Sequence, residues 1–195
     1  MNPLEIEFLG TGTSQGVPII SCDCEICQSK NPKNNRLRSS VLIKSGNSSV
    51  VIDCGPDFRQ QMLRSKCQRL NAVVLTHEHM DHIAGLDDVR PFNFKTKLDM
   101  PVYCTKRVEN RLKEQFSYAF SAEKYPGSPG FEIININSNE NFKIGNQRWT
   151  PILAQHGTWP VTGFRIQDFV YMTDISGISK LESQKILGSK VLVIN

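Results

Sequence analysis

Apolar positions along the chain alternate with polar ones or form short runs, which predicts many short β-strands with a few helices between them. Residues 4–9 (LEIEFL) alternate with a period of two, and residues 71–76 (NAVVLT) form a short buried run. Further strands are expected at 39–45, 48–53, 100–105, 131–136, 142–145, 147–154, 161–166, 169–174 and 190–195, and helices at 55–66, 106–118 and 178–187. Tight joins between consecutive strands favour a mixed α/β fold with much antiparallel sheet over a regular βαβ winding.

Length and composition indicate an ordinary globular chain. At 195 residues it is long enough for a single domain, residues 1–195, with its own core. A net charge of +4, with 22% charged and 39% hydrophobic residues, does not require a nucleic-acid partner. Residues 1–10 lack the basic and apolar regions of a signal peptide, and no segment approaches the ~20 apolar residues of a membrane span. We therefore expect a cytoplasmic protein with no membrane partner.

Histidine is concentrated in one place. Three of the four histidines, His77, His79 and His82, fall within six residues, with Asp81 among them. On an extended backbone His77 and His79 project to the same side, so both imidazoles can reach one ion. Asp81 and His82 follow where the chain turns toward a helix, which aims them at a different point. A lone histidine at a strand end is usually capped or solvated, but this cluster predicts two adjacent metal positions.

A second cluster, Cys22, Cys24 and Cys27, forms a C-x-C-x-x-C pattern on a loop. In a chain without a secretion signal such spacing points to metal before disulfide. A closed structural zinc site takes four ligands, so a fourth must come from elsewhere. Reduced cysteines without a ligand role are the alternative. Four cations in residues 30–38 could contact a phosphate or an RNA backbone, although such runs are most often solvated surface.

The stretch THEHMDHIAGL (76–86) resembles the H-x-H-x-D-H signature of the metallo-β-lactamase superfamily of hydrolases. VVIDCGPD (50–57) is similar to the segment that carries the superfamily's early aspartate, here Asp53; AQHG supplies His156, and YMTD supplies Asp174. The resemblance implies an αββα sandwich of two mixed sheets, with a dinuclear metal site at one edge.

The resemblance also implies six metal ligands in two groups that share one carboxylate: His77, His79 and His156 for one ion, Asp81 and His82 for the other, and Asp174 bridging both. Asp53 would accept the second N–H of a ligating imidazole; the alternative is a turn residue before Gly55. Imidazole and carboxylate ligands suit Zn²⁺, Mn²⁺ or Fe²⁺, and the sequence does not choose among them. Asp81 and Asp174 are the expected catalytic residues, because their carboxylates would hold the ions that carry the reaction.

GTGTSQGVPIISCDCEIC (10–27) is similar to the N-terminal segment of the phosphoribosyl cyclic phosphodiesterases of phosphonate breakdown. In that family the cysteines hold a structural zinc. The protein of pyrroloquinoline quinone biosynthesis has a similar loop, so the loop marks a branch of the superfamily rather than one reaction. The tRNA 3′ processing endonucleases share the FLGTG start but lack the cysteines.

The favoured function is a metal-dependent phosphodiesterase that uses a hydroxide held by two metal ions to cleave a small cyclic phosphate or nucleotide-like substrate. A tRNA-processing nuclease or a thioesterase with the same ions is the alternative, and residues 106–130 offer no long arm for gripping tRNA. A non-catalytic metal-binding module is the third hypothesis.

The end of the sequence carries a further expectation. The family continues beyond the position of Asn195 and there supplies the last histidine of the second metal, the general acid and the fourth ligand of the cysteine zinc, whereas no histidine follows His156 here. We expect residues 1–195 to be an incomplete portion of a longer chain. An uncovered final apolar strand would favour self-association, so a homodimer is among the expected partners.

Overall fold

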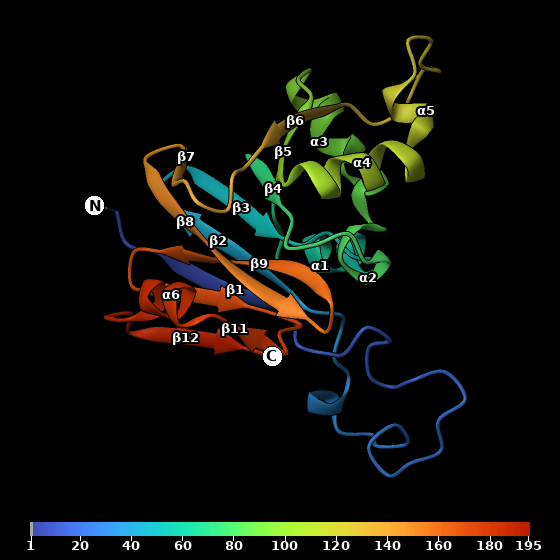
Figure 1. Cartoon of the computed structure of the whole chain (residues 1–195). Coiled ribbons are helices and arrows are strands. Elements are labelled where there is room, and N and C mark those ends of the chain that lie inside the picture. Colours follow the sequence, from blue (N-terminus) through green and yellow to red (C-terminus); the bar gives the residue numbers. More distant parts are fainter. Residues whose placement is uncertain (1) are drawn as a thin grey trace.

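The computed structural model describes residues 2–195 and contains two six-stranded β-sheets (Figure 1). In spatial order the first sheet consists of β1 (Glu5–Gly10), β2 (Ser40–Ser45), β3 (Ser48–Ile52), β4 (Ala72–Val74), β5 (Met100–Cys104) and β6 (Phe131–Asn135). The pairs from β1 to β3 are antiparallel, and those from β3 to β6 are parallel. The expected mixture of strand directions is therefore present within this one sheet.

The second sheet is mostly antiparallel. Its order is β11 (Gly177–Ile178), β8 (Gln147–His156), β9 (Trp159–Ile166), β10 (Phe169–Met172) and β12 (Val191–Ile194), and β7 (Phe142–Ile144) also pairs with β8. Only β12 joins its neighbour in parallel. All the strands predicted from the sequence are confirmed within a few residues, and the two-residue β11 is an addition.

Helices lie on the two outer faces of the stacked sheets (Figure 1). On one side are α1 (Phe58–Arg64), α2 (Met80–Ile83), α3 (Arg90–Thr96), α4 (Lys106–Gln115) and α5 (Ser117–Phe120), together with the 3₁₀ turn η2 (Leu86–Val89); on the other are α6 (Lys180–Ser183) and the 3₁₀ turn η3 (Gln184–Ile186). The helix predicted at 106–118 is interrupted at Phe116, whose backbone ψ of 36° leaves the helical range. The short helices between residues 80 and 96 were not predicted as separate elements. The sequence predicted only that the chain turns toward a helix near His82. None of the described helices has the length and apolar character needed to cross a membrane.

Three separate apolar clusters show that the layers are helix, sheet, sheet and helix. On β2, Leu42 packs in the cluster beneath α1 and α4, whereas Val41 and Ile43 pack in the cluster between the two sheets. On β10, Tyr171 lies in the cluster between the sheets and Val170 lies in the cluster beneath η3. Alternate side chains of a strand point to opposite faces of its sheet, so both sheets are covered on both faces. The predicted αββα sandwich is confirmed.

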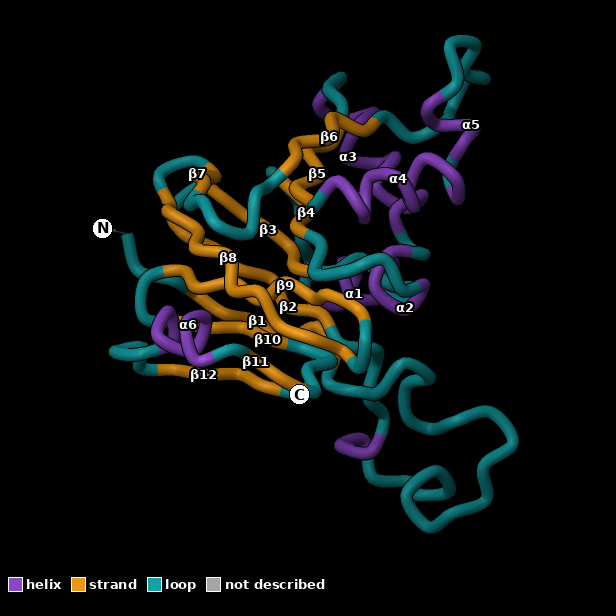
Figure 2. The backbone as a smooth tube through the Cα atoms, in the orientation of Figure 1, coloured by secondary structure: helices purple, strands orange, loops and turns teal. Residues whose placement is uncertain are grey.

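A long loop, residues 11–39, leaves the sandwich between β1 and β2 and carries the three clustered cysteines (Figure 2). Its two arms are joined by reciprocal backbone hydrogen bonds of 2.8 Å between Val17 and Arg36. A 3.0 Å ion pair between Arg38 and Asp57 attaches the returning arm to the start of α1. The positive charge of Arg38 is thus paired with a carboxylate within the fold.

Two glycines allow the end of β3 to dock against the segment around α2. The backbone amide of Cys54 donates to the carbonyl of His82 at 2.7 Å, and the amide of Gly85 donates to the carbonyl of Cys54 at 2.8 Å. A Cβ at Gly55 would lie 1.9 Å from the carbonyl oxygen of Asp81, and a Cβ at Gly85 would lie 2.0 Å from that of Gly55. Only glycine permits this approach, which fixes the segment bearing Asp81 and His82.

Gly85→Ala is expected to lower the free energy of unfolding by about 1–3 kcal/mol or more, because the added methyl group overlaps backbone that cannot move away cheaply. Gly177→Ala is the matched control, since a Cβ there would meet only Gln155 Oε1 at 3.9 Å. Urea denaturation of both variants measures the difference. Equal stabilities would show that the segment around α2 can shift without cost.

Candidate metal centre

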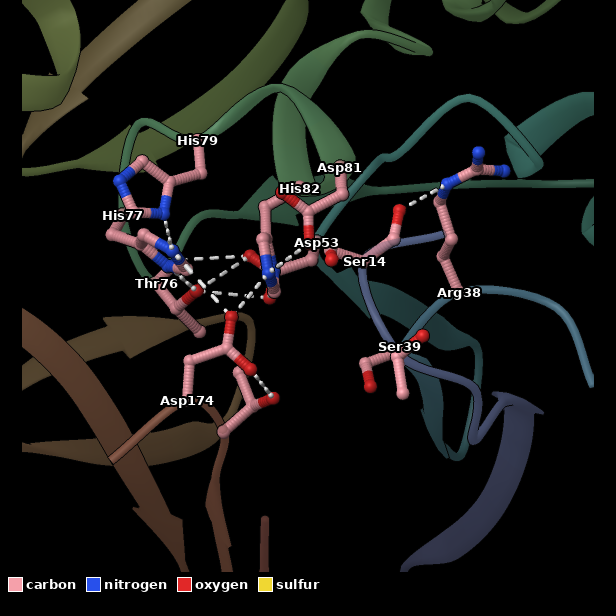
Figure 3. A network of polar contacts seen from close by, with 12 residues as sticks. Ser14, Arg38, Ser39, Asp53, Thr76, His77, His79, Asp81, His82 and Asp174 are labelled. Atoms are coloured by element: carbon pink, nitrogen blue, oxygen red, sulfur yellow. Dashed lines mark hydrogen bonds and ion pairs between the residues drawn. The ribbon is translucent and has the colours of Figure 1, made fainter. Parts of the chain in front are cut away.

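The predicted site residues converge where strands of both sheets end. Asp53 follows β3, His77 and His79 follow β4, His156 closes β8, and Asp174 follows β10. Parallel strands, with their loops, bring such residues to one edge of a sheet, the usual place for a site in an α/β fold. Figure 3 shows the side chains of Asp53, His77, His79 and Asp174 directed toward a common point. The edge location expected from the sequence is therefore present.

His77, His79 and His156 form the first group of converging ligand atoms, all within 4.8 Å of one another. His77 Nε2 lies 3.0 Å from His79 Nδ1, and the ring centroids of His79 and His156 are 5.3 Å apart. The two histidines at i and i+2 thus meet as their spacing predicted, and the third comes from the other sheet.

A second group shares one histidine with the first. His77, His82 and Asp174 also offer ligand atoms within 4.8 Å of one another. His82 Nε2 lies 2.8 Å from Asp174 Oδ2 and 3.1 Å from Asp81 Oδ2. Asp81 therefore contacts His82, and Asp174 lies close to both His82 and His77. The distance from Asp174 Oδ2 to His77 Nε2 is 3.6 Å. This is the position that a bridging carboxylate would need.

Asp53 lies behind the cluster and is fully buried. Its carboxylate accepts hydrogen bonds from the backbone amide of Thr76 at 2.9 Å and from the Thr76 hydroxyl at 2.9 Å, and it lies 2.7 Å from His82 Nδ1. With Asp53 holding Nδ1, the Nε2 of His82 faces Asp174. A carboxylate that supports a ligating imidazole would make this contact.

Thr76 also contacts residues of the candidate site, and it was not predicted from the sequence. Its hydroxyl oxygen lies 3.0 Å from His77 Nδ1 as well as contacting Asp53. Thr173 stands in a similar relation to Asp174, to whose Oδ1 its hydroxyl donates at 3.2 Å. In the sequence, the only indication of these contacts is that each threonine immediately precedes a candidate ligand.

The pKa values of the two central histidines, His77 and His82, are shifted in opposite directions. Burial, together with the neighbouring His82, lowers the pKa of His77 to about 4, so its imidazole is neutral at ordinary pH. Burial by itself would also lower the pKa of His82, but Asp53, Asp174 and Asp81 raise it well above the usual value. Burial would raise the pKa of Asp174, yet its contact with His82 brings that pKa to about 2.

These donor atoms fit divalent metal ions. Carboxylates of Asp53, Asp81 and Asp174 surround the buried imidazole of His82, so the cluster favours positive charge there, supplied by a proton on His82 or by a bound cation. Neutral imidazole nitrogens and ionised carboxylates are the ligand atoms that Zn²⁺, Mn²⁺ and Fe²⁺ accept. The two overlapping groups give two adjacent places where such an ion could be held.

The three clustered cysteines also come together. The ligand sulfurs of Cys22, Cys24 and Cys27 lie within 4.8 Å of one another, and the backbone amide of Ile19 donates to Cys27 Sγ at 3.3 Å. Interactions with the backbone of Cys27 and with the side chain of Cys22 lower the pKa of Cys24 to about 7. Three converging sulfurs, one of them readily ionised, offer three of the four ligands that zinc takes.

Comparison with known proteins agrees with this geometry. A β-lactamase superfamily domain matches residues 48–195. An octanoyltransferase of Porphyromonas gingivalis is 35% identical over 189 residues, which cover 96% of this chain but only 38% of that protein. The chain therefore spans less than two fifths of that curated relative.

Two solved structures have the same arrangement of elements. One is a diphosphatase from the PhnP family, with 35% identity and a TM-score of 0.89 over 97% of this chain and 73% of the other. The second is the Zn²⁺-bound PqqB of Methylobacterium extorquens, with 19% identity and a TM-score of 0.77 over 97% and 72% of the two chains, which shows a likeness of fold. From the family match, the sandwich and the converging histidines and aspartates, the chain belongs to the metallo-β-lactamase superfamily of hydrolases.

Proposed function

We propose that this protein is a metal-dependent phosphodiesterase that acts on a small cyclic phosphate or nucleotide-like substrate. The observation that carries the proposal is the pair of overlapping ligand groups that share His77. Two adjacent divalent ions suit the displacement of an oxygen at phosphorus, because they can stabilise both the entering and the leaving oxygen and lower the pKa of a bound water. The likeness to a PhnP-family diphosphatase, with 35% identity and a TM-score of 0.89, supports phosphorus chemistry.

The chain's own residues would divide the work as follows. His77, His79 and His156 would hold one ion, and Asp81 and His82 would hold the other, with Asp174 between them. Asp53 would fix the tautomer of His82, because it lies 2.7 Å from Nδ1 and so leaves Nε2 to act as a ligand. Thr76 would hold Asp53 in place through two hydrogen bonds.

The cysteine loop would hold a structural zinc through Cys22, Cys24 and Cys27. The three sulfurs already converge, and a closed zinc site requires a fourth ligand from elsewhere. The loop is joined to the sandwich through Arg38 and Asp57. A zinc ion there would stabilise a segment that has little apolar packing of its own, since none of the residues from 18 to 36 is buried.

A small phosphodiester is the proposed partner, and nucleic acid is the less favoured alternative. Residues 106–130 form α4, α5 and a short connection to β6, which gives no extended arm comparable to one that would clamp a tRNA. The formal net charge of +4 is also modest for a protein that binds a polyanion.

Metal analysis tests the ligand sets. We expect the purified protein to contain up to two transition-metal ions in the histidine centre and one zinc in the cysteine loop. Asp174→Ala should reduce the first content more than any other single change, because Asp174 lies beside both His77 and His82 and would contact both ions. Cys24→Ser should reduce only the zinc, and Cys67→Ser, at a cysteine outside the cluster, should change neither. Elemental analysis measures the contents, and folded protein free of Zn, Mn and Fe would refute the proposal.

Activity tests the reaction. Hydrolysis of bis(p-nitrophenyl) phosphate and of a 2′,3′-cyclic nucleotide should be abolished by Asp81→Asn. Asp53→Asn should lower kcat/KM by about 10- to 100-fold, as loss of a carboxylate that orients a ligating imidazole usually does. Asp168→Asn is the matched control, because Asp168 pairs with Lys190 on the surface. Turnover of thioesters or lactams without phosphodiester cleavage would contradict the proposal.

A further inference from the structure

Ser176 joins the loop after β10 to the end of β8 by three hydrogen bonds. Its backbone amide donates to the carbonyl of Gln155 at 2.7 Å, its hydroxyl donates to the same carbonyl at 3.1 Å, and the hydroxyl accepts from the backbone amide of Gly157 at 2.7 Å. Gln155 and Gly157 flank His156, and Ser176 follows Asp174 by two residues. One side chain therefore links the two segments of the second sheet that carry candidate ligands.

The hydroxyl of Ser176 holds the backbone beyond the point where regular strand pairing ends. The ladder between β11 and β8 stops at Gln155. Beyond it β8 turns into β9 immediately after His156, and Gly157 in this turn has a φ of 62°. The amide of Gly157 therefore lies outside the strand ladder, and its hydrogen-bond partner is the Ser176 hydroxyl. The turn that follows His156 is thus held by a side chain from the other loop.

Asp174 has a backbone conformation that its neighbours must hold in place. Its φ of 58° lies in the left-handed region, which is unfavourable for a non-glycine residue and persists only where the surrounding structure fixes it. On one side of the loop, the amide of Ile175 donates to the carbonyl of Asn195 at 3.1 Å. On the other side, Ser176 binds the end of β8. Asp174 is thus fixed by two attachments, and the one made by Ser176 leads to His156.

Ser176 does not line the cleft that adjoins the histidine cluster. This cleft, of about 710 Å³, opens beside His79 and is also lined by Arg107 on α4 and by Trp159, whereas Ser176 is not among its lining residues. Within residues 2–195, the hydroxyl of Ser176 forms hydrogen bonds only with backbone groups at the end of β8. Any effect of Ser176 on the site must therefore pass through the positions of the two ligand-bearing segments.

We propose that Ser176 is a positioning residue that sets the separation of His156 from Asp174 and thereby the metal affinity of the centre. His156 belongs to the first ligand group and Asp174 to the second, and Asp174 also lies 3.6 Å from His77, which both groups share. A shift of one loop relative to the other would therefore move ligand atoms of both groups apart. The inference rests on the proposed metal-dependent function and adds a residue that would touch neither the substrate nor an ion.

Ser176→Ala removes the hydroxyl and leaves the backbone hydrogen bond to Gln155 in place. We expect the affinity for Co²⁺ to fall by about 10- to 100-fold, the usual effect of losing a group that orients metal ligands. Competition with a chelator measures this affinity, and the visible spectrum of bound Co²⁺, unlike that of Zn²⁺, reports the ligand geometry. The spectrum of Ser176→Ala should differ from that of the unaltered protein. Ser176→Thr keeps a hydroxyl and should restore both the affinity and the spectrum.

Ser183→Ala is the matched control, because the hydroxyl of Ser183 on α6 also bonds to backbone, the carbonyl of Lys180 at 2.9 Å, but belongs to no ligand-bearing segment. It should leave the affinity and the spectrum unchanged. Urea denaturation of the metal-free proteins should give similar midpoints for the two alanine variants, since exposed hydrogen bonds contribute little to stability. Unchanged Co²⁺ binding in Ser176→Ala, an equal loss in Ser183→Ala, a loss that threonine does not restore, or a much lower midpoint for Ser176→Ala would overturn the inference.

Metal binding separates this inference from the proposed reaction, because it is measured without a substrate. If no phosphodiester is cleaved but Ser176→Ala selectively weakens Co²⁺ binding, the phosphodiesterase proposal fails and the positioning role stands. If phosphodiesters are cleaved and Ser176→Ala keeps full affinity and an unchanged spectrum, the reaction stands and the positioning role fails. Unaltered protein that binds no Co²⁺ would contradict both.

Discussion

The buried carboxylate of Asp53 is the constraint around which the candidate centre is built. A fully buried carboxylate is costly unless it is hydrogen-bonded and paired, and here Thr76 and His82 satisfy both of its oxygens. Asp53 also has a φ of 63°, a conformation that non-glycine residues adopt at a cost of about 1–3 kcal/mol. The contacts that offset this cost are the same ones that aim His82 at Asp174, so local strain and site geometry have a common origin.

The centre also depends on the contact between the two sheets. His77 and His82 are attached to the first sheet, whereas His156 and Asp174 extend from the second. Their separation is set by the apolar layer between the sheets, where Trp149 packs in an almost fully buried position. Because a close-packed interior transmits small changes in volume, the ligand distances depend on side chains that never touch the site. The packing of the two sheets thus holds the ligands of the first sheet at a fixed distance from those of the second.

The sequence predicted those features that depend on local periodicity. The strands followed from alternation, and the approach of His77 to His79 followed from their i, i+2 spacing. Features that depend on three-dimensional contacts were missed: α3 lacks a clear apolar period and contains no fully buried residue, and Arg107 reads as one more cation on an exposed helix. The resemblance supplied the partners His156 and Asp174, because no spacing rule connects residues so distant in the chain.

The candidate metal cluster and the adjoining cleft are formed by different parts of this structure. The ligand cluster is determined by strand ends and by Asp53, whereas the adjoining cleft is determined by α4, by Trp159 and by the pair of Arg107 with Glu78. A change on α4 can therefore alter what enters the cleft while the ligand geometry stays intact. This separation is one physical reason why members of one fold can act on different substrates. The histidine motif, by contrast, is a feature of the superfamily, so differences between its members are to be sought in the residues around the cluster rather than in the motif.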